Sequence, residues 1–486
     1  MSAGAAPPLA NFTACSPLDP VSLFPEKRPH EVSFLGLVVG EKVFLIENAQ
    51  FLMEYSYCNL LFYVRHHVYS HKKYSKNGIT IKYRDLLKHI RPEKGYSSTS
   101  VRGTIYCSNQ KERNVGLPSD HIAVGAKVIY AAAPAMGHNQ ESHPECNSRV
   151  PAILTALEKM KLTSKFRGSD VVEVQNFRPA KTDDIGSVHA GPYISGLEKA
   201  MDQASEKGLI FIDGSGPTYA TATTFQESLL AAGAGISLVD SVVAASRVSK
   251  DPPVAFALIR PPGHHAVPKG AMGFCVFGNI AIAARYAQRM HGLKRVFIID
   301  FDVHHGNGTN DAFYEDPDIF FLSTHQAGSY PGTGKIDQIG SGSGEGSTLN
   351  LPLPGGSGDT AMRTVFDEVI VPCAQRFKPD IILVSAGYDA HLLDPLASLQ
   401  FTTGTYYMLA SSIKQLAKDL CGGRCVFFLE GGYNLSSLSN SVAESFRAFL
   451  GDRSLASELD DPSYLHEEPL KKVKQIIEKV KHIHSF

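Results

Sequence analysis

The chain has 486 residues, 43% of them hydrophobic, and a formal net charge of −1 at pH 7, which favours one large domain with extensions and a sizeable core. This balance hides an asymmetry, because residues 1–113 hold 15 Lys and Arg against 9 Asp and Glu, whereas residues 114–486 hold 32 against 39. The larger part is therefore mildly acidic and lacks the basic footprint of a nucleic-acid-binding domain, so we expect no direct contact with DNA or RNA.

Neither a membrane span nor a secretory signal is predicted. The most hydrophobic region, residues 34–64, is interrupted by charged residues, and the first 25 residues lack a basic start and an apolar core. The eight cysteines are scattered, which favours free thiols in a reducing, intracellular compartment. Cys421 and Cys425 resemble half a zinc site, but no second Cys or His pair faces them, and we interpret them as parts of a turn that leads into a strand. No feature of the sequence indicates an oligomeric state.

Residues 1–113 form a predicted N-terminal extension. Residues 1–30 are rich in Ala, Pro and Ser and are predicted to be disordered. Residues 65–91 carry eight Lys and Arg and one acidic residue, and we interpret them, with their pair His66–His67, as a solvated basic stretch. Residues 95–111 are rich in Ser and Thr and free of acidic residues. That composition is typical of the end of a chloroplast or mitochondrial transit peptide, or of a polar linker in a nuclear or cytoplasmic protein.

From residue 124 onward, short apolar runs alternate with segments of helical pattern, which predicts an α/β domain over residues 114–453. Such alternation is typical of a single large domain with a central, mostly parallel sheet covered by helices on both faces. Beyond it, the apolar spacing in residues 470–483 predicts an amphipathic C-terminal helix, within residues 454–486, that docks on the domain. The predicted strands cover residues 124–131, 254–259, 296–299, 319–322, 381–384 and 426–429, and the predicted helices residues 150–160, 225–246, 276–290, 362–377 and 406–420.

Polar, chemically capable segments begin where four of these strands end. Ligand sites in open α/β sheets gather beyond the carboxyl ends of the strands, so this arrangement predicts one active site at that edge. The four segments are RPPGHH (residues 260–265), DFDVHH (300–305), SAGYDA (385–390) and EGGY (430–433).

The second segment has the residues of a metal site. Asp300, Asp302 and His304 alternate, and alternate side chains of an extended chain share a face. His264 and His265 are adjacent, so both can serve one site only from a turn, which the preceding Pro-Pro-Gly provides. A catalytic zinc ion takes three protein ligands and leaves space for water and substrate. Asp302 and His304 supply two ligands, and the third must come from another segment.

These residues resemble the zinc-dependent histone deacetylase family, in its class II-like branch, within the arginase/deacetylase superfamily. The match runs from about residue 137 to residue 452 and also includes GHNQESHPECNSR (137–149), GFC (273–275), SAGYDAHLLDPL (385–396) and EGGYN (430–434). The resemblance implies a hydrolase that removes acetyl groups from N-acetylated amines, first of all acetyl-lysine in histones, and so a role in chromatin regulation, or acetyl-lysine in other proteins. The alternatives are a deacetylase of small N-acetyl amines, whether polyamines or aromatic amines, and a non-catalytic scaffold.

The resemblance also implies roles for individual residues. Asp389 completes the Zn²⁺ site with Asp302 and His304, while His265 is the general base and then the acid toward the leaving amine. His264 is its electrostatic partner, Asp300 supports His264, and Tyr433 donates a hydrogen bond to the developing oxyanion. Asn307, where class I members carry Asp, supports His265, and a neutral amide should leave that imidazole less basic.

Two further sites follow from the resemblance. The first is a narrow tunnel for an aliphatic stem, lined by Gly273, Phe274, Tyr330 and Leu396. Tyr330 stands where Phe is common, and Leu396 speaks against polyamine specificity because polyamine-preferring relatives place a carboxylate near that position. The second is a structural monovalent-cation site for K⁺, formed by Asp300, Asp302, His304, Ser323 and Thr324.

Overall fold

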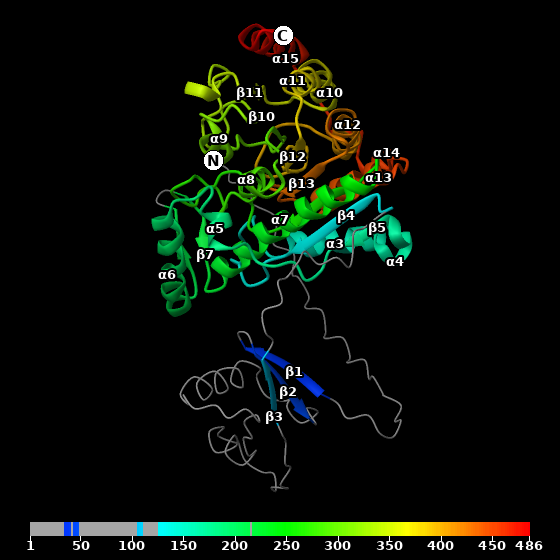
Figure 1. Cartoon of the computed structure of the whole chain (residues 1–486). Coiled ribbons are helices and arrows are strands. Elements are labelled where there is room, and N and C mark those ends of the chain that lie inside the picture. Colours follow the sequence, from blue (N-terminus) through cyan, green and yellow to red (C-terminus); the bar gives the residue numbers. More distant parts are fainter. Residues whose placement is uncertain (1–33, 40–41, 48–104, 110–124, 214–215) are drawn as a thin grey trace, which may run out of the picture. The chain divides into compact units, whose positions relative to one another are not determined.

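The computed structural model describes residues 34–39, 42–47, 105–109, 125–213 and 216–486 (Figure 1). The chain divides into two compact units, Met1–Pro118 and Ser119–Phe486. In the first unit, β1 (Phe34–Val39), β2 (Lys42–Glu47) and β3 (Ile105–Asn109) form an antiparallel sheet with β2 in the middle. Residues 1–30 and 65–91, for which disorder and a solvated basic stretch were predicted, lie outside the described residues. So does the segment 95–111, apart from the residues of β3.

The second unit is built on an eight-stranded sheet in which every pair of neighbouring strands is parallel. The strand order is β11-β10-β9-β12-β13-β8-β4-β5, and a separate antiparallel pair, β6–β7, lies outside this sheet. The predicted parallel sheet is therefore confirmed. Its strands are β4 (Val128–Ala133), β5 (Val171–Glu173), β8 (Val254–Ile259), β9 (Val296–Asp300), β10 (Ile319–Gln326), β11 (Thr348–Leu353), β12 (Ile381–Ala386) and β13 (Cys425–Leu429), and the pair consists of β6 (Ile210–Phe211) and β7 (Tyr219–Ala220).

Helices cover both faces of this sheet, and each face has its own apolar core (Figure 1). Successive residues of one strand enter opposite cores: Phe297 and Ile299 of β9 lie in one, and Val296 and Ile298 in the other. This two-sided burial explains why the strands are continuous apolar runs. The helices are α3 (Arg149–Lys159), α4 (Ser164–Arg167), α5 (Thr182–Ile185), α6 (Gly191–Lys207), α7 (Thr224–Val248), α8 (Asn279–His291), α9 (Asn307–Phe313), α10 (Asp359–Val365), α11 (Val371–Phe377), α12 (Thr403–Cys421), α13 (Leu435–Leu450), α14 (Ala456–Leu459) and α15 (Leu470–His484).

The bounds of the predicted elements differ from the structure by a few residues, and two differences have a clear physical cause. The strand predicted over residues 124–131 begins at Val128 and ends at Ala133, because Gly125 has a φ of +94°, which an extended strand does not accommodate. The helix predicted over residues 362–377 is α10 and α11 joined by a π-helical turn, Phe366–Ile370, just before Pro372. Proline lacks an N–H group and its ring collides with the preceding turn, so an irregular turn upstream of it relieves that conflict.

Helix α7 is long and apolar enough to cross a membrane by length and composition, but most of it is buried inside the protein. It packs against β8, β4 and α8. A Cβ atom at Gly235 of this helix would collide with the ring of Phe428 in β13, so the glycine permits close approach to the sheet. Helix α7 is accordingly the core helix of an α/β domain, and it is the one helix in the described part of the chain that meets the length and composition criteria.

The five cysteines whose side chains are described are free. Cys421 ends α12 and Cys425 begins β13, with Gly422 between them in the left-handed conformation. The turn predicted at this spacing is therefore confirmed.

The C-terminal helix α15 is docked on the domain through its apolar face. Val473, Ile477 and Val480 are buried in the core that also contains residues of α10, α12 and α13. Ahead of the helix, the carboxylate of Glu468 accepts hydrogen bonds from the free N–H groups at the start of α10, at 2.8–2.9 Å.

The packing of α15 predicts that Ile477→Ala destabilises the protein. The side chain is 1% exposed, and removing it leaves a cavity that costs about 2–5 kcal/mol. The midpoint of urea unfolding, followed by circular dichroism, measures the loss. Gln475→Ala, on the exposed face of the same helix, is the control and should change stability by less than about 0.5 kcal/mol. Equal midpoints for the two variants would contradict the docking.

Candidate active site

The four polar segments lie at one edge of the sheet. They follow β8, β9, β12 and β13, which are consecutive, parallel neighbours in the order β9-β12-β13-β8. Their carboxyl ends therefore meet, as the sequence predicted. We call this the carboxyl edge.

Asp302, His304 and Asp389 converge at the carboxyl edge. All three are buried, and one ligand atom of each lies within 4.8 Å of the other two. Nδ1 of His304 is 3.1 Å from Oδ1 of Asp302 and 3.1 Å from Oδ2 of Asp389. The sequence predicted this convergence from alternation along an extended strand, and that cause is wrong. Strand β9 ends at Asp300, and the residues after it form a bend. Asp300 points elsewhere, toward His264.

Backbone donors hold the two carboxylates of this trio in place. The N–H of Gly431 donates to Asp302 at 2.8 Å, and the N–H of Val303 donates to Asp389 at 2.9 Å. A Cβ atom at Gly431 would collide with Asp389, so only glycine lets the backbone come this close. The loop after β13 thus holds Asp302 through Gly431, and the loop after β9 holds Asp389 through Val303.

The electrostatics of the trio favour a positive charge between its two carboxylates. Burial lowers the pKa of His304, but hydrogen bonds and charge interactions with Asp302 and Asp389 outweigh burial and raise it to about 10. Burial, together with the negative charge of Asp302, raises the pKa of Asp389 to about 7. Two buried carboxylates side by side are unfavourable without a positive charge between them. One imidazole nitrogen and two carboxylate oxygens are a donor set that suits zinc, so the residues fit the ion that the family generally uses.

The adjacent histidines lie beside this trio with their expected partners. Nδ1 of His264 donates to Oδ2 of Asp300 at 3.1 Å, and Nδ1 of His265 donates to Oδ1 of Asn307 at 2.7 Å. Each bond places the hydrogen on Nδ1 and leaves Nε2 able to accept a proton. The rings of His265 and His304 are 5.9 Å apart between centroids. His265 therefore borders the candidate metal site.

The two histidines differ in charge. Burial lowers the pKa of His264, but the carboxylates of Asp302 and Asp300 raise it well above the ordinary value. Burial and the neighbouring His264 and His304 hold the pKa of His265 well below that value. The surroundings therefore favour a charged imidazole at His264 and a neutral one, which can act as a base, at His265.

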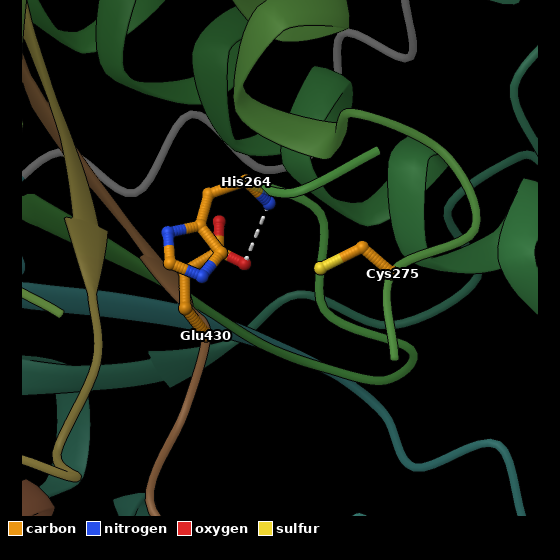
Figure 2. A group of neighbouring side chains, drawn as sticks. All are labelled: His264, Cys275 and Glu430. Carbon is orange, nitrogen blue, oxygen red and sulfur yellow. Dashed lines mark hydrogen bonds between the residues drawn. The ribbon is translucent and has the colours of Figure 1, made fainter. Parts of the chain in front are cut away.

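Glu430 and Cys275, to which the sequence gave no role, complete the turn that carries the histidines (Figure 2). Oε2 of Glu430 accepts hydrogen bonds from the N–H groups of Gly263, at 2.6 Å, and His264, at 3.1 Å. The thiol of Cys275 lies 3.4 Å from the N–H of His265. His264, Cys275 and Glu430 also lie close enough to count as a metal-binding group, but the Glu430 oxygens are already engaged by the backbone and by Ser385. We therefore assign Glu430 to support of the turn.

Tyr433, in the segment after β13, lies next to Phe274, one of the residues predicted to line the tunnel. Its ring contacts the ring of Phe274 edge to face, with centroids 5.7 Å apart, and the guanidinium of Arg149 lies 5.0 Å from its centre. Nε of Arg149 donates to the carbonyl of Gly432 at 2.7 Å. Burial and the charge of Asp389 raise the pKa of Tyr433 well above its ordinary value, so the phenol keeps its proton and can donate it in a hydrogen bond.

Gly273 and Tyr330, two of the residues predicted to line the tunnel, contact His265. The ring of Tyr330 lies edge to face against His265, with centroids 5.1 Å apart. A Cβ atom at Gly273 would stand 2.5 Å from the His265 ring and 2.9 Å from the Tyr330 ring, so these rings close directly over the glycine. Tyr330 and Leu396 are 41% and 38% exposed, which places them at the surface end of the site.

The predicted monovalent-cation residues are only partly brought together. Oγ1 of Thr324 lies 3.4 Å from the carbonyl oxygen of Asp300, one strand away in the sheet. The hydroxyl of Ser323, by contrast, is bonded to Nδ1 of His325 at 2.9 Å.

A parallel sheet whose carboxyl edge holds a buried Asp-His-Asp group, a histidine couple and a tyrosine defines an amide hydrolase of the arginase/deacetylase fold. Comparisons with known proteins agree. The histone deacetylase domain model matches residues 143–449. The chain is 72% identical over 383 residues to histone deacetylase 14, chloroplastic, of Arabidopsis thaliana, covering 79% of this chain and 90% of the relative.

Two more relatives point the same way. Histone deacetylase 10, chloroplastic, of Oryza sativa subsp. japonica is 70% identical over 391 residues, covering 80% of this chain and 87% of that protein. The crystal structure of the HDA15 HD domain superposes with a TM-score of 0.63 at 31% identity, covering 74% of this chain and 94% of that structure. The chain belongs to the histone deacetylase family, and it is a deacetylase.

The pairing of His265 with an amide predicts a shifted pH profile for Asn307→Asp. A carboxylate at Nδ1 favours the protonated imidazole and raises the pKa of His265. Activity needs the unprotonated base, so the acidic limb of the plot of kcat/KM against pH should move to higher pH. The profile, measured on an acetyl-lysine peptide, tests this, and an acidic limb that stays in place would show that Asn307 does not tune the base.

Proposed function

We propose that this protein is a zinc-dependent deacetylase that hydrolyses acetyl-lysine in proteins. The observation that carries the proposal is the placement of His265, held neutral by its surroundings, beside the buried Asp302–His304–Asp389 group, with Tyr433 against Phe274 at the same edge of the sheet. A scaffold without activity would not require this combination, and every residue of it is present.

The ligands of the metal would be Asp302, His304 and Asp389. When bound, zinc would act as a Lewis acid toward the acetyl carbonyl and would make a neighbouring water molecule more acidic. The family generally depends on zinc, which supports this assignment. We also propose that a potassium ion takes the backbone oxygens near Asp300 and the hydroxyl of Thr324, since hard oxygen donors suit such an ion.

The chain's own residues would carry the proton transfers. Nε2 of His265 takes a proton from water as its oxygen forms a bond to the acetyl carbon. The phenol of Tyr433 donates a hydrogen bond to the carbonyl oxygen as negative charge develops there. As the carbon–nitrogen bond breaks, His265 returns the proton to the amine, which leaves acetate and a free amine. His264, held charged by Asp300, stabilises the negative charge throughout.

The residues at the exposed end of the proposed tunnel indicate which substrates would fit there. Leu393, Leu396, Leu435 and Tyr330 are each 38–47% exposed around the loops that hold Tyr433 and His265. An apolar surface there suits an aliphatic lysine stem, and Leu396 provides no carboxylate to bind a polycation. It also suits a small acetylated amine with an uncharged, aromatic body, which is our second candidate substrate.

The compartment we propose is the chloroplast. Two relatives that share at least 70% identity with this chain carry the word chloroplastic in their names. The segment 95–111, rich in Ser and Thr and free of acidic residues, supports targeting to an organelle, since transit peptides are rich in Ser and poor in acidic residues. The substrates would then be acetylated proteins of that organelle rather than nuclear histones.

A substrate panel tests the proposed function. The purified chain is incubated with acetyl-lysine peptides, an acetylated polyamine and an acetylated arylalkylamine, with and without a chelator. We expect the highest kcat/KM on the peptides, loss of turnover with the chelator and recovery on addition of Zn²⁺. Turnover that survives removal of the metal would end the zinc mechanism, and a preference for the arylalkylamine would replace the protein substrate by the second candidate.

The role of Tyr433 predicts a large loss for Tyr433→Phe. Removing one oxyanion donor lowers kcat by roughly 100- to 1000-fold. KM should change little, because the ring that borders the tunnel remains. Tyr286→Phe, which loses a hydroxyl bonded to Asp240 on α7, is the control and should keep kcat. A Tyr433→Phe enzyme with unchanged kcat would exclude the phenol from the reaction.

A further inference from the structure

Asp394 connects the exposed end of the tunnel to Tyr433. Its side chain is 5% exposed, although it lies in the loop that carries the exposed residues Leu393 and Leu396. Oδ2 accepts the backbone N–H of Tyr433 at 2.7 Å and that of Asn434 at 3.3 Å. Oδ1 accepts the N–H of Leu396 at 3.0 Å. One carboxylate therefore ties two loops together.

The backbone around Tyr433 depends on this carboxylate. Gly432 has a φ of +117°, which leaves the segment without the regular hydrogen bonds of a strand, and α13 begins only at Leu435. In the described part of the chain, the N–H groups of Tyr433 and Asn434 have Asp394 as their side-chain acceptor. A charged acceptor makes stronger hydrogen bonds than a neutral one, and a partly buried N–H that loses its partner is costly.

We propose that Asp394 is a positioning residue: it fixes the backbone of Tyr433, so that the phenol points at the reacting amide, and it couples this placement to Leu396 at the tunnel end. The inference rests on the proposed role of Tyr433. Asp394 touches neither the substrate nor the metal ligands and acts through the tyrosine. Misplacement of a catalytic group by about 1 Å can cost roughly 100-fold in rate.

A double-mutant cycle tests the proposal. Asp394→Ala, Tyr433→Phe and the double variant are compared with the native full-length chain on an acetyl-lysine peptide. We expect Asp394→Ala to lower kcat by roughly 100-fold with little change in KM, as a 1 Å displacement does. In the Tyr433→Phe background the same change should cost less than about threefold, because residues that act through each other are not additive. Equal losses in the two backgrounds would overturn the proposal.

Two further variants separate positioning from general damage to the fold. Asp394→Asn keeps one oxygen, which can face the Tyr433 and Asn434 N–H groups, so it should recover most of the kcat that the alanine variant loses; failure to recover any would count against the proposal. Asp380→Ala removes a carboxylate that accepts the N–H of Arg295 at 2.7 Å, just before β12 and β9 begin and so at the opposite edge of the sheet, and should lower Tm without lowering kcat. If Tyr433→Phe alone keeps full kcat, the proposed function of Tyr433 fails; if that variant is slow but the cycle is additive, only the role of Asp394 fails.

Discussion

The burial of two carboxylates against one imidazole is the constraint on which the rest of this structure depends. Asp302 and Asp389 are fully buried, and neither is paired with Arg or Lys in the described part of the chain. Two carboxylates buried side by side are unfavourable for folding unless a positive charge, on His304 or on a bound cation, lies between them. Backbone N–H groups from Gly431 and Val303 hold the carboxylates at the spacing a small cation needs. The sheet must therefore be built so that three loops meet within a few ångströms.

A parallel sheet meets that requirement with little cost to its core. Strands β9, β12, β13 and β8 are apolar except for Asp300 and Ser385 near their carboxyl ends, because both faces are covered, so each can end at one edge with a polar loop after it. Most polar side chains of the site lie in the loops, and the apolar side chains that stabilise the domain lie in the strands and the helices that cover them. The same separation explains why glycines recur at the edge, where backbone must approach the ligands closely.

Much of this could be predicted from the sequence, because continuous apolar strands and the polar residues after them are local signals. The partners of His264 and His265 followed from the resemblance to the family. Other features could not be predicted, because they are set by contacts between distant segments. Asp394 and Glu430 act on backbone N–H groups of loops that are 39 and 167 residues away in the chain. A side chain that accepts from backbone N–H groups leaves no mark on the sequence of the segment it holds. The bend after Asp300 likewise depends on a contact with a distant loop, the one that carries Asp389.

The adjacent histidines show how one site separates two identical side chains. Their rings are 4.0 Å apart, and both are buried, so burial alone would make both neutral. The difference comes from the charges around each ring: the carboxylates of Asp302 and of Asp300, the partner of Nδ1, favour a charged His264, whereas Nδ1 of His265 has a neutral amide, Asn307, as its partner. The charge on His264 then depresses the pKa of His265 further. The charges around each ring, to which the carboxylate and the amide at Nδ1 contribute, thus decide which imidazole is the base and which holds charge, and the order of the residues in the chain does not.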